Sequence, residues 1–410
     1  MTGIWASQFN VIKDREDLSN SMLGFIVLCG YLGSVVVTPV SGILIRYWGS
    51  KKTVILGALL YSLSMALIAA VNGVPLLCIT FFIFGFNMNI MDVAMNTSGV
   101  LVETVAERPI MGSFHGNYSI AAALGSFIGG LLTSQGYSYQ EVYLLFSGLT
   151  VFLNIIGCQG LYAIKDELDI EIKSKSSEPE NKEKSKLDDE EAPACMIPTG
   201  PALYLCIVGF LGASGEASLV AWCITYFDED LNASAVNATV GFSTFYVFMG
   251  LGRFSCDKIR QYIGRQRMFF FAGILAFLGM SLVFAAPNVE TSNGSIILAC
   301  FGCALAGSGI STIIPTCFST AGRLPGEHPG TAIATVAFIS YSGSVVSPIM
   351  VGGLSDALSS LRWALMIEGI LLLFLSPLSF GIPPETGTID GKDSALEPLL
   401  ALDEEKISIS

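Results

Sequence analysis

Charged residues are scarce in this chain: Asp, Glu, Lys and Arg make up 13% of its 410 residues, whereas hydrophobic residues make up 52%. Such a composition excludes an ordinary soluble protein. The alternating polar and apolar pattern of a membrane β-barrel strand is also missing. The apolar runs are instead continuous and about 20 residues long, which is the length of a helix that crosses a bilayer. The sequence therefore predicts an all-α polytopic membrane protein.

The short motifs of common enzymes are absent as well. The sequence contains no GxSxG nucleophile motif and no phosphate-cradling P-loop. Cys300 and Cys303 share a helix face, but no nearby His or further Cys completes a metal-ligand set. We therefore predict no enzymatic activity, no metal ion and no cofactor, and no nucleic-acid partner.

Eleven apolar stretches are long enough to span a bilayer. The connections at 46–52, 103–111, 164–200, 258–267 and 320–329 carry most of the Lys and Arg residues, so the positive-inside rule places them in the cytoplasm. Three glycosylation sequons then face outward, at Asn232, Asn237 and Asn293. The predicted spans are 20–45, 53–72, 75–102, 112–134, 141–163, 201–227, 237–257, 268–287, 295–319, 330–354 and 361–382.

The net charge of −13 is concentrated in two segments that are rich in Ser, Glu, Lys and Pro and poor in aromatic residues. This composition is typical of disorder. The first segment divides the apolar stretches into two groups. We predict an N-terminal helical half at 1–163, a cytoplasmic linker at 164–200, a C-terminal helical half at 201–382 and an acidic cytoplasmic tail at 383–410.

The two halves contain a faint repeat. GILIRYWGSKK at 42–52 and GRFSCDKIRQYIGRQR at 252–267 each run from a glycine-led helix end into a basic turn that contains glycine. Both loops resemble the signature of the major facilitator superfamily. Five further stretches resemble its fucose-permease-like branch: GIWASQFNVIKD at 3–14, MDVAMN at 91–96, ERPIMGSFHG at 107–116, GISTIIPTCFSTAGRLPG at 309–326 and TAIATVAFISYSGSVVSPIMVGGL at 331–354.

This resemblance implies twelve helices in two six-helix halves, with alternating access to a central site and, frequently, sugar transport driven by protons. GIWASQF at 3–9 would be the outer end of helix 1, so we expect the chain to begin about halfway along that helix, through a truncated gene model or a natural short form. The acid that the family carries after helix 2 is Arg46 here. Gating is assigned to residues of the two loops, with simple cytoplasmic anchoring as the alternative: Arg46, Lys51, Lys52, Arg253 and Asp257, the last two forming an i, i+4 pair of opposite sign.

A polar stripe runs along the predicted helix at 75–102. Asn89, Asp92 and Asn96 recur with helical spacing, and Gly85, Gly99 and Glu103 continue the same face. A carboxylate within a bilayer costs about 2.5 to 3.5 kcal/mol and normally faces a cavity or a partner. Asp92 is therefore predicted to bind solute and the coupling proton, whereas the alternative is a hydrogen bond between helices.

In the family resemblance, Asp92 and Asn96 reproduce the spacing of an acid and an asparagine on helix 4, while the helix-1 acid falls near Ala6. His115 and Tyr118, at the start of the next helix, are further candidate solute ligands. For His115, a helix-capping role is the alternative.

Glu216 lies among glycines on the first helix of the second half, and we predict that it binds solute or a proton opposite Asp92. A buried structural pair is the alternative for Glu216. Trp222 and Tyr226 are predicted to stack on a sugar ring, or to anchor the helix at the membrane interface. Glu368 is expected to reach the outer interface.

Taken together, these features predict a secondary transporter for a small polar solute, with sugars as the candidate class and proton symport as the mechanism. A proton-coupled exporter of drugs or metabolites is one alternative. The fifth helix reads SIAAALGSFIGGLL, without the Gly-Pro pair usual in such antiporters, which favours uptake. A transport-inactive receptor or scaffold is the other alternative. The expected partners are the solute, protons and the lipid bilayer, and the expected state is a monomer.

Overall fold

The computed structural model describes residues 1–106, 111–160, 197–321, 324 and 329–382. Within these ranges the regular elements are all helical, which confirms the predicted all-α class. The N-terminal half contains α1 (Thr2–Ser7), α2 (Phe9–Arg15), α3 (Asn20–Ala69), α4 (Val74–Ala106), α5 (Met111–Ser134), α6 (Tyr139–Gly157) and η1 (Cys158–Gly160). The C-terminal half contains α9 (Gly200–Glu229), α10 (Ala235–Ala285), η2 (Ala286–Asn288), α11 (Ser292–Ile310), α12 (Ile313–Ala321), α13 (Pro329–Leu358), α14 (Leu361–Leu373), α15 (Leu375–Leu378) and η3 (Ser379–Gly381).

Ten helical segments in the described part of the chain are long and apolar enough to cross a bilayer. The predicted span at 112–134 coincides with the helix α5, which is not one of these ten. An integral, multi-pass membrane protein is therefore confirmed. The central linker and the acidic tail fall mainly or wholly in 161–196 and 383–410, which lie outside the described residues.

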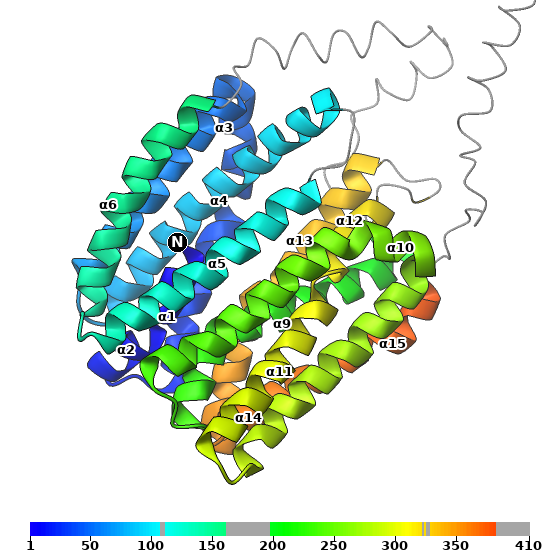
Figure 1. The fold of residues 1–410 in the computed structure, drawn as a ribbon. Helices are drawn as coiled ribbons and strands as arrows, with labels where there is room; N and C mark the ends of the chain where they lie inside the picture. The colour runs from blue at the N-terminus through cyan, green and yellow to red at the C-terminus, as the bar shows by residue number, and fades with distance from the viewer. Residues whose placement is uncertain (107–110, 161–196, 322–323, 325–328, 383–410) are drawn as a thin grey trace, which may run out of the picture.

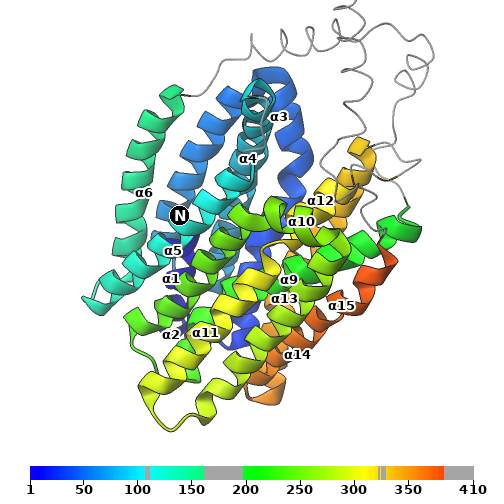
Figure 2. The ribbon, with the colours of Figure 1, turned by 45° about the vertical axis from the view of Figure 1, so that its right-hand side comes forward.

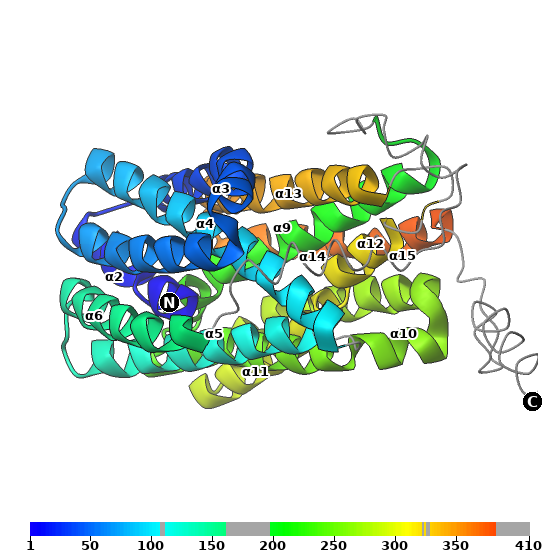
Figure 3. The ribbon, with the colours of Figure 1, turned by 90° about the horizontal axis from the view of Figure 1, so that it is seen from above.

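The helices form two bundles that meet along two helix pairs (Figures 1 and 2). One pair is α5 with α10, and the other is α3 with α13. Viewed from above, these pairs lie at opposite edges of the junction between the halves (Figure 3). Small residues permit the close approach. A Cβ added to Gly24 of α3 would lie only 2.6 Å from the backbone oxygen of Pro348 in α13.

The repeated basic loops have the same backbone conformation in both halves. Gly49 interrupts α3 at φ 77° and ψ 167°, and Gly264 interrupts α10 at φ 77° and ψ 160°. This region of backbone space is open only to glycine, because a Cβ would clash with the neighbouring peptide. Each long helix is therefore two membrane helices joined by a tight glycine turn, as the sequence repeat predicts.

Replacing Gly264 by alanine should destabilise the protein by about 1 to 3 kcal/mol, because the alanine must occupy a strained backbone conformation. Thermal unfolding of the purified protein in detergent measures the effect. Gly148→Ala is the matched control: Gly148 lies within α6 with nothing near its Cβ position. If both variants unfold at the same temperature, the glycine turn does not require glycine at position 264.

Candidate functional site

The polar stripe of α4 has two parts: Gly85 packs against a neighbouring helix, and Asn89, Asp92 and Asn96 make hydrogen bonds. A Cβ on Gly85 would collide with the backbone oxygen of Gly30 on α3, so Gly85 serves helix contact. Asn89 accepts a hydrogen bond from the Thr38 hydroxyl on α3, at 3.4 Å. The Asn96 amide donates to the Asp92 carboxylate at 3.2 Å, within the same helix. Both side chains are partly exposed.

An ion pair between Glu216 and Arg253 connects the helices at the junction. The Arg253 guanidinium donates to both carboxylate oxygens of Glu216, at 3.1 and 3.2 Å, and so joins α10 to α9. It also donates to the Ser119 hydroxyl on α5 at 2.9 Å. The Arg253 and Glu216 side chains are 10% and 22% exposed. Arg253 therefore bridges the two halves through charge-assisted hydrogen bonds.

The described partners of Arg253 are Glu216 and Ser119. The sequence predicts a pair with Asp257, one turn along the same helix, and this pair stays a prediction. In this conformation Glu216 forms an ion pair with Arg253, which agrees with the alternative prediction of a buried structural pair. The side chains of Arg46 and Asp257 lie outside the described residues.

Two tyrosines interact electrostatically with both this ion pair and Asp92. Tyr118 on α5 and Tyr341 on α13 lie within electrostatic range of both Asp92 and Glu216. They are 40% and 48% exposed, so protein atoms do not seal them. The Tyr118 hydroxyl donates to Thr2 of α1 at 2.9 Å. We call Asp92, Tyr118, Glu216, Arg253 and Tyr341 the central polar cluster.

Further polar residues lie around the central polar cluster. His115 lies within electrostatic range of Arg253 and Glu216 and is half-buried. Tyr31 and Tyr246 interact electrostatically with Glu216. The sequence missed Tyr31, Ser119, Tyr246 and Tyr341. Tyr341 could have been found, since it lies within the family-like stretch at 331–354 and carries a polar group inside a predicted span.

Trp222 and Tyr226 do not reach the central polar cluster through their polar atoms. The Trp222 ring is fully buried, and its indole N–H donates to the Pro348 carbonyl at 3.1 Å. The Tyr226 hydroxyl, also buried, donates to the Val283 carbonyl. Neither ring is available for sugar stacking in this conformation, and neither lies at a lipid interface. Both instead hold α9 against neighbouring helices.

Glu368 also differs from expectation. The sequence placed it at the outer interface, but its side chain on α14 is 0% exposed. The helix turns this position toward the protein interior.

Polar contacts join the halves at the end predicted to face outward. Lys13 on α2 forms an ion pair with Glu229 at the end of α9. The Asn10 amide donates to Asp228 at 2.9 Å and accepts from the Thr225 hydroxyl at 2.6 Å. These contacts hold α2 against α9, so this end of the junction is closed.

A second outer contact links α3 with α13. Asp356 accepts hydrogen bonds from the backbone N–H groups of Asn20 and Ser21, at 3.2 and 2.8 Å. It therefore caps the α3 N-terminus from the other half of the protein. A polar pocket of about 390 Å³ lies beside it, lined by Asn20, Glu229, Asp230, Ser355, Asp356, Ser359, Ser360 and Leu361. Burial, with the nearby negative charge of Glu229, raises the pKa of Asp230 to about 6.

Replacing Asp356 by alanine should weaken this outer contact by about 1 kcal/mol, because two N–H groups at the α3 N-terminus lose their acceptor. Hydrogen–deuterium exchange of the first turn of α3 should then be roughly fivefold faster. Asp14→Ala is the control, since Asp14 is an exposed acid on the same side of the protein. Equal exchange in both variants would contradict the capping role.

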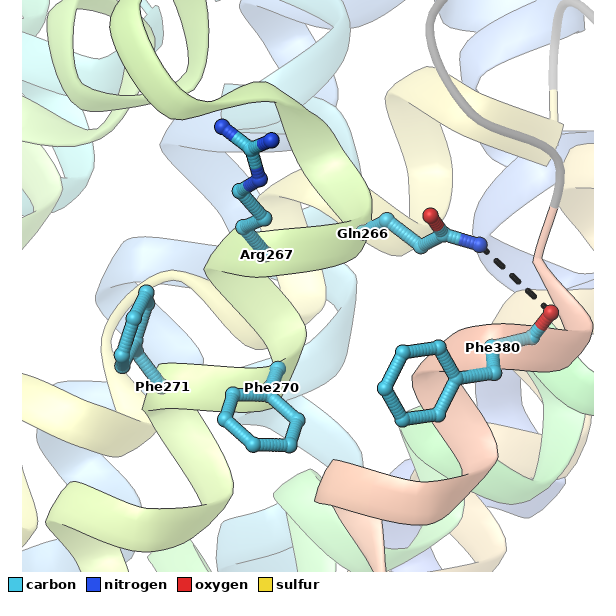
Figure 4. Close-up of a pocket in the computed structure, with 5 residues that line it drawn as sticks. All are labelled: Gln266, Arg267, Phe270, Phe271 and Phe380. Carbon is cyan, nitrogen blue, oxygen red and sulfur yellow. Dashed lines mark hydrogen bonds between the residues drawn. The ribbon is translucent and has the colours of Figure 1, made fainter.

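The apolar groove shown in Figure 4 is not part of this site. It has a volume of about 220 Å³ and lies between α10 and η3, and none of its lining residues belongs to the central polar cluster. The Gln266 amide donates to the backbone oxygen of Phe380 at 3.5 Å across it. Its remaining lining residues are Arg267, Phe270 and Phe271, a surface suited to lipid rather than to a polar solute.

The other predicted residues lie on the surface. Lys51 is partly buried and Lys52 exposed, both just after the Gly49 turn. Asn232 and Asn293 are exposed outside the helix interiors, and Asn237 is half-buried in the first turn of α10. Loop gating and glycosylation stay predictions. Within the described residues, no group of three or more His, Cys, Asp or Glu side chains is placed to hold a metal ion.

Two bundles with a polar cluster at their junction define a membrane transporter fold. The sequence profile of the Major Facilitator Superfamily matches residues 2–348 and 205–402, and the chain belongs to this family. It is 27% identical over 369 residues to an uncharacterized MFS-type transporter of Yersinia pestis, covering 90% of this chain and 88% of that one. It is 25% identical over 368 residues to the membrane protein MosC of Rhizobium meliloti, covering 89% and 83%.

Solved transporter structures share the fold. A mutant of the nucleoside transporter NupG aligns with a TM-score of 0.70 at 12% identity, covering 92% of this chain and 96% of that one. The D-xylose-proton symporter aligns with a TM-score of 0.68 at 15% identity, covering 94% and 95%. At such identities the likeness concerns the fold alone, which confirms the two-half architecture. The protein is a membrane transporter of the major facilitator type.

Proposed function

We propose that this transporter carries a small polar solute, with sugars as the first class to test, by proton symport and alternating access. The observation that carries the proposal is the bridge from Arg253 to Glu216 and Ser119 across the junction, with Asp92 in electrostatic range of the same tyrosines. Donors, acceptors and aromatic rings lie together there, as hydroxyl-rich solutes require. The sequence likeness to the fucose-permease-like branch also supports this solute class.

Each residue has a proposed role. Asp92 binds the coupling proton, and Asn89, Asn96, His115 and Tyr118 contact the solute. Arg253 loses its bond to Ser119 when the halves part, so that the Arg253–Glu216 pair becomes available to solute or a proton. Trp222 and Tyr226 are left out of this proposed site, because their polar atoms already bind backbone carbonyls.

Solute uptake by the full-length protein in liposomes tests the proposal. We expect at least one of a panel of radiolabelled pentoses, hexoses, deoxyhexoses and nucleosides to accumulate when an inward proton gradient is imposed. A protonophore should abolish the accumulation. Liposomes without protein are the control.

Three outcomes would overturn it in different ways. Uptake that does not depend on the proton gradient would exclude symport and support facilitated diffusion. Efflux driven by an inward proton gradient would establish the exporter alternative. The absence of any flux across the panel would favour the receptor or scaffold alternative.

A further inference from the structure

Glu368 is an acidic side chain enclosed by membrane helices. It lies seven residues after the start of α14 and is 0% exposed. Neither carboxyl oxygen has a hydrogen-bond partner among the described residues. The Ser214 hydroxyl on α9 is near enough to act on it electrostatically, although not with the geometry of an ordinary hydrogen bond. No described cation forms an ion pair with it.

An ionised carboxylate cannot persist in such surroundings. A charge buried without a counter-ion or donors loses its hydration and gains nothing in exchange, so the group takes up a proton and becomes neutral. A neutral carboxylic acid instead carries an O–H donor, which Ser214 can accept after a small side-chain rotation.

Among the described residues, the elements packed against α14 supply no hydrogen-bond partner to the Glu368 carboxyl oxygens. These elements are α9, α10, α13 and the short α15, which carries no ionisable side chain. On α9 the Glu216 carboxylate is bound by Arg253, and the Tyr226 hydroxyl is bound to Val283. On α13, Asp356 caps α3 at the outer end. The remaining described ionisable side chains of these helices are Tyr204, Cys206, Cys223, Tyr246, Cys256 and Tyr341, with Asp228 and Glu229 at the outer end of α9 and Lys258, Arg260, Tyr262, Arg265 and Arg267 around the Gly264 turn of α10.

We propose that Glu368 is a proton-binding site of the C-terminal half, occupied in this outward-closed conformation and emptied when α14 and α9 move apart. The proton comes from water and returns to water: the carboxylate binds one proton and later releases the same proton. Its part in transport rests on the proposed function, whereas protonation of Glu368 does not.

The geometry of α9 connects this site to the central polar cluster. Ser214 and Glu216 are two residues apart, so their side chains leave α9 about 200° apart. One face of α9 thus meets Glu368 on α14, and the nearly opposite face meets Arg253 on α10. A shift of α9 that loosens Glu216 from Arg253 therefore also changes the surroundings of Glu368. This coupling would let protonation of Glu368 bias the position of α9.

Infrared spectroscopy of the full-length protein in liposomes tests the proposal without any solute. A protonated carboxylic acid gives a C=O stretching band that is separate from the carboxylate bands. We expect this band at neutral pH in the wild type and its loss in Glu368→Gln. Glu290→Gln, which changes an exposed acid in the α10–α11 connection, is the control and should retain it. Asp92→Asn separates any contribution of the other membrane acid.

The outcomes distinguish the two proposals. A wild type without the band, or a Glu368→Gln variant that keeps it unchanged, overturns the proton-binding site. If Glu368→Gln does not fold, Glu368→Asp keeps the acid and should shift the band; an unshifted band also overturns the proposal. If the band is lost but gradient-driven uptake by Glu368→Gln equals that of wild type, the role in transport is overturned and the site stands. Absence of all uptake concerns the proposed function only.

Discussion

Replacing Arg253 by alanine should abolish transport and destabilise the protein by about 3 kcal/mol, the lower end of the range for breaking a buried ion pair. The lower end applies because Glu216 is still 22% exposed. Without the guanidinium, Glu216 retains a partly buried charge with no counter-ion, and Ser119 loses its link to the other half. Thermal unfolding in detergent and uptake in liposomes measure the two effects.

Arg260→Ala is the matched control for this variant. Arg260 lies on the same helix and donates to Ser319 on α12, within the C-terminal half. Arg253→Lys should recover part of the stability but not the paired hydrogen bonds to both carboxylate oxygens. Adding Glu216→Gln to Arg253→Ala should restore most of the lost stability, because the uncompensated charge is gone. If Arg253→Ala behaves like Arg260→Ala, the bridge between the halves has no energetic role.

Asp92→Asn should eliminate accumulation driven by a proton gradient while leaving exchange of solute across the membrane. An amide keeps the shape and can still hydrogen-bond Asn96, but it cannot bind and release a proton. Uptake with and without the gradient, followed by counterflow of preloaded solute, measures both properties. We expect the accumulation ratio to fall to the value without a gradient.

Asn89→Ala provides the contrast for Asp92. Asn89 lies one turn away on the same stripe and bonds Thr38, so its loss should weaken solute affinity and leave coupling intact. Persistent accumulation by Asp92→Asn would show that Asp92 serves helix packing through Asn96 instead.

The fold was accessible from the sequence because bilayer thickness dictates the length of each span. Continuous apolar runs therefore identified the helices, and the repeated basic loops identified Gly49 and Gly264 as equivalent turns. Asp92 was accessible for a related reason: an acid among apolar residues is costly enough to indicate a specific environment.

The contacts within the site were not accessible in the same way. Arg253 and Glu216 are 37 residues apart on different helices, and their meeting depends on how each helix is rotated about its axis. That rotation depends on which glycines and small residues pack against a neighbouring helix. The spacing of residues in the sequence does not reveal this. The same uncertainty misplaced Trp222 and Glu368, since an apolar span offers no polar face to distinguish lipid from the interior.

The contacts that close the outer end also limit how a solute can drive the transporter. Moving a two-state equilibrium from 1:99 to 99:1 requires about 5.5 kcal/mol of differential affinity. Five of the described polar contacts close the outer end, and at about 0.5 to 1.5 kcal/mol each they total about 2.5 to 7.5 kcal/mol, which includes that value. The links from Asn10, Lys13 and Asp356 are of this kind. If these contacts were stronger, more of the free energy of solute binding would be needed to break them. The apparent dissociation constant for solute should therefore rise as the outer contacts strengthen.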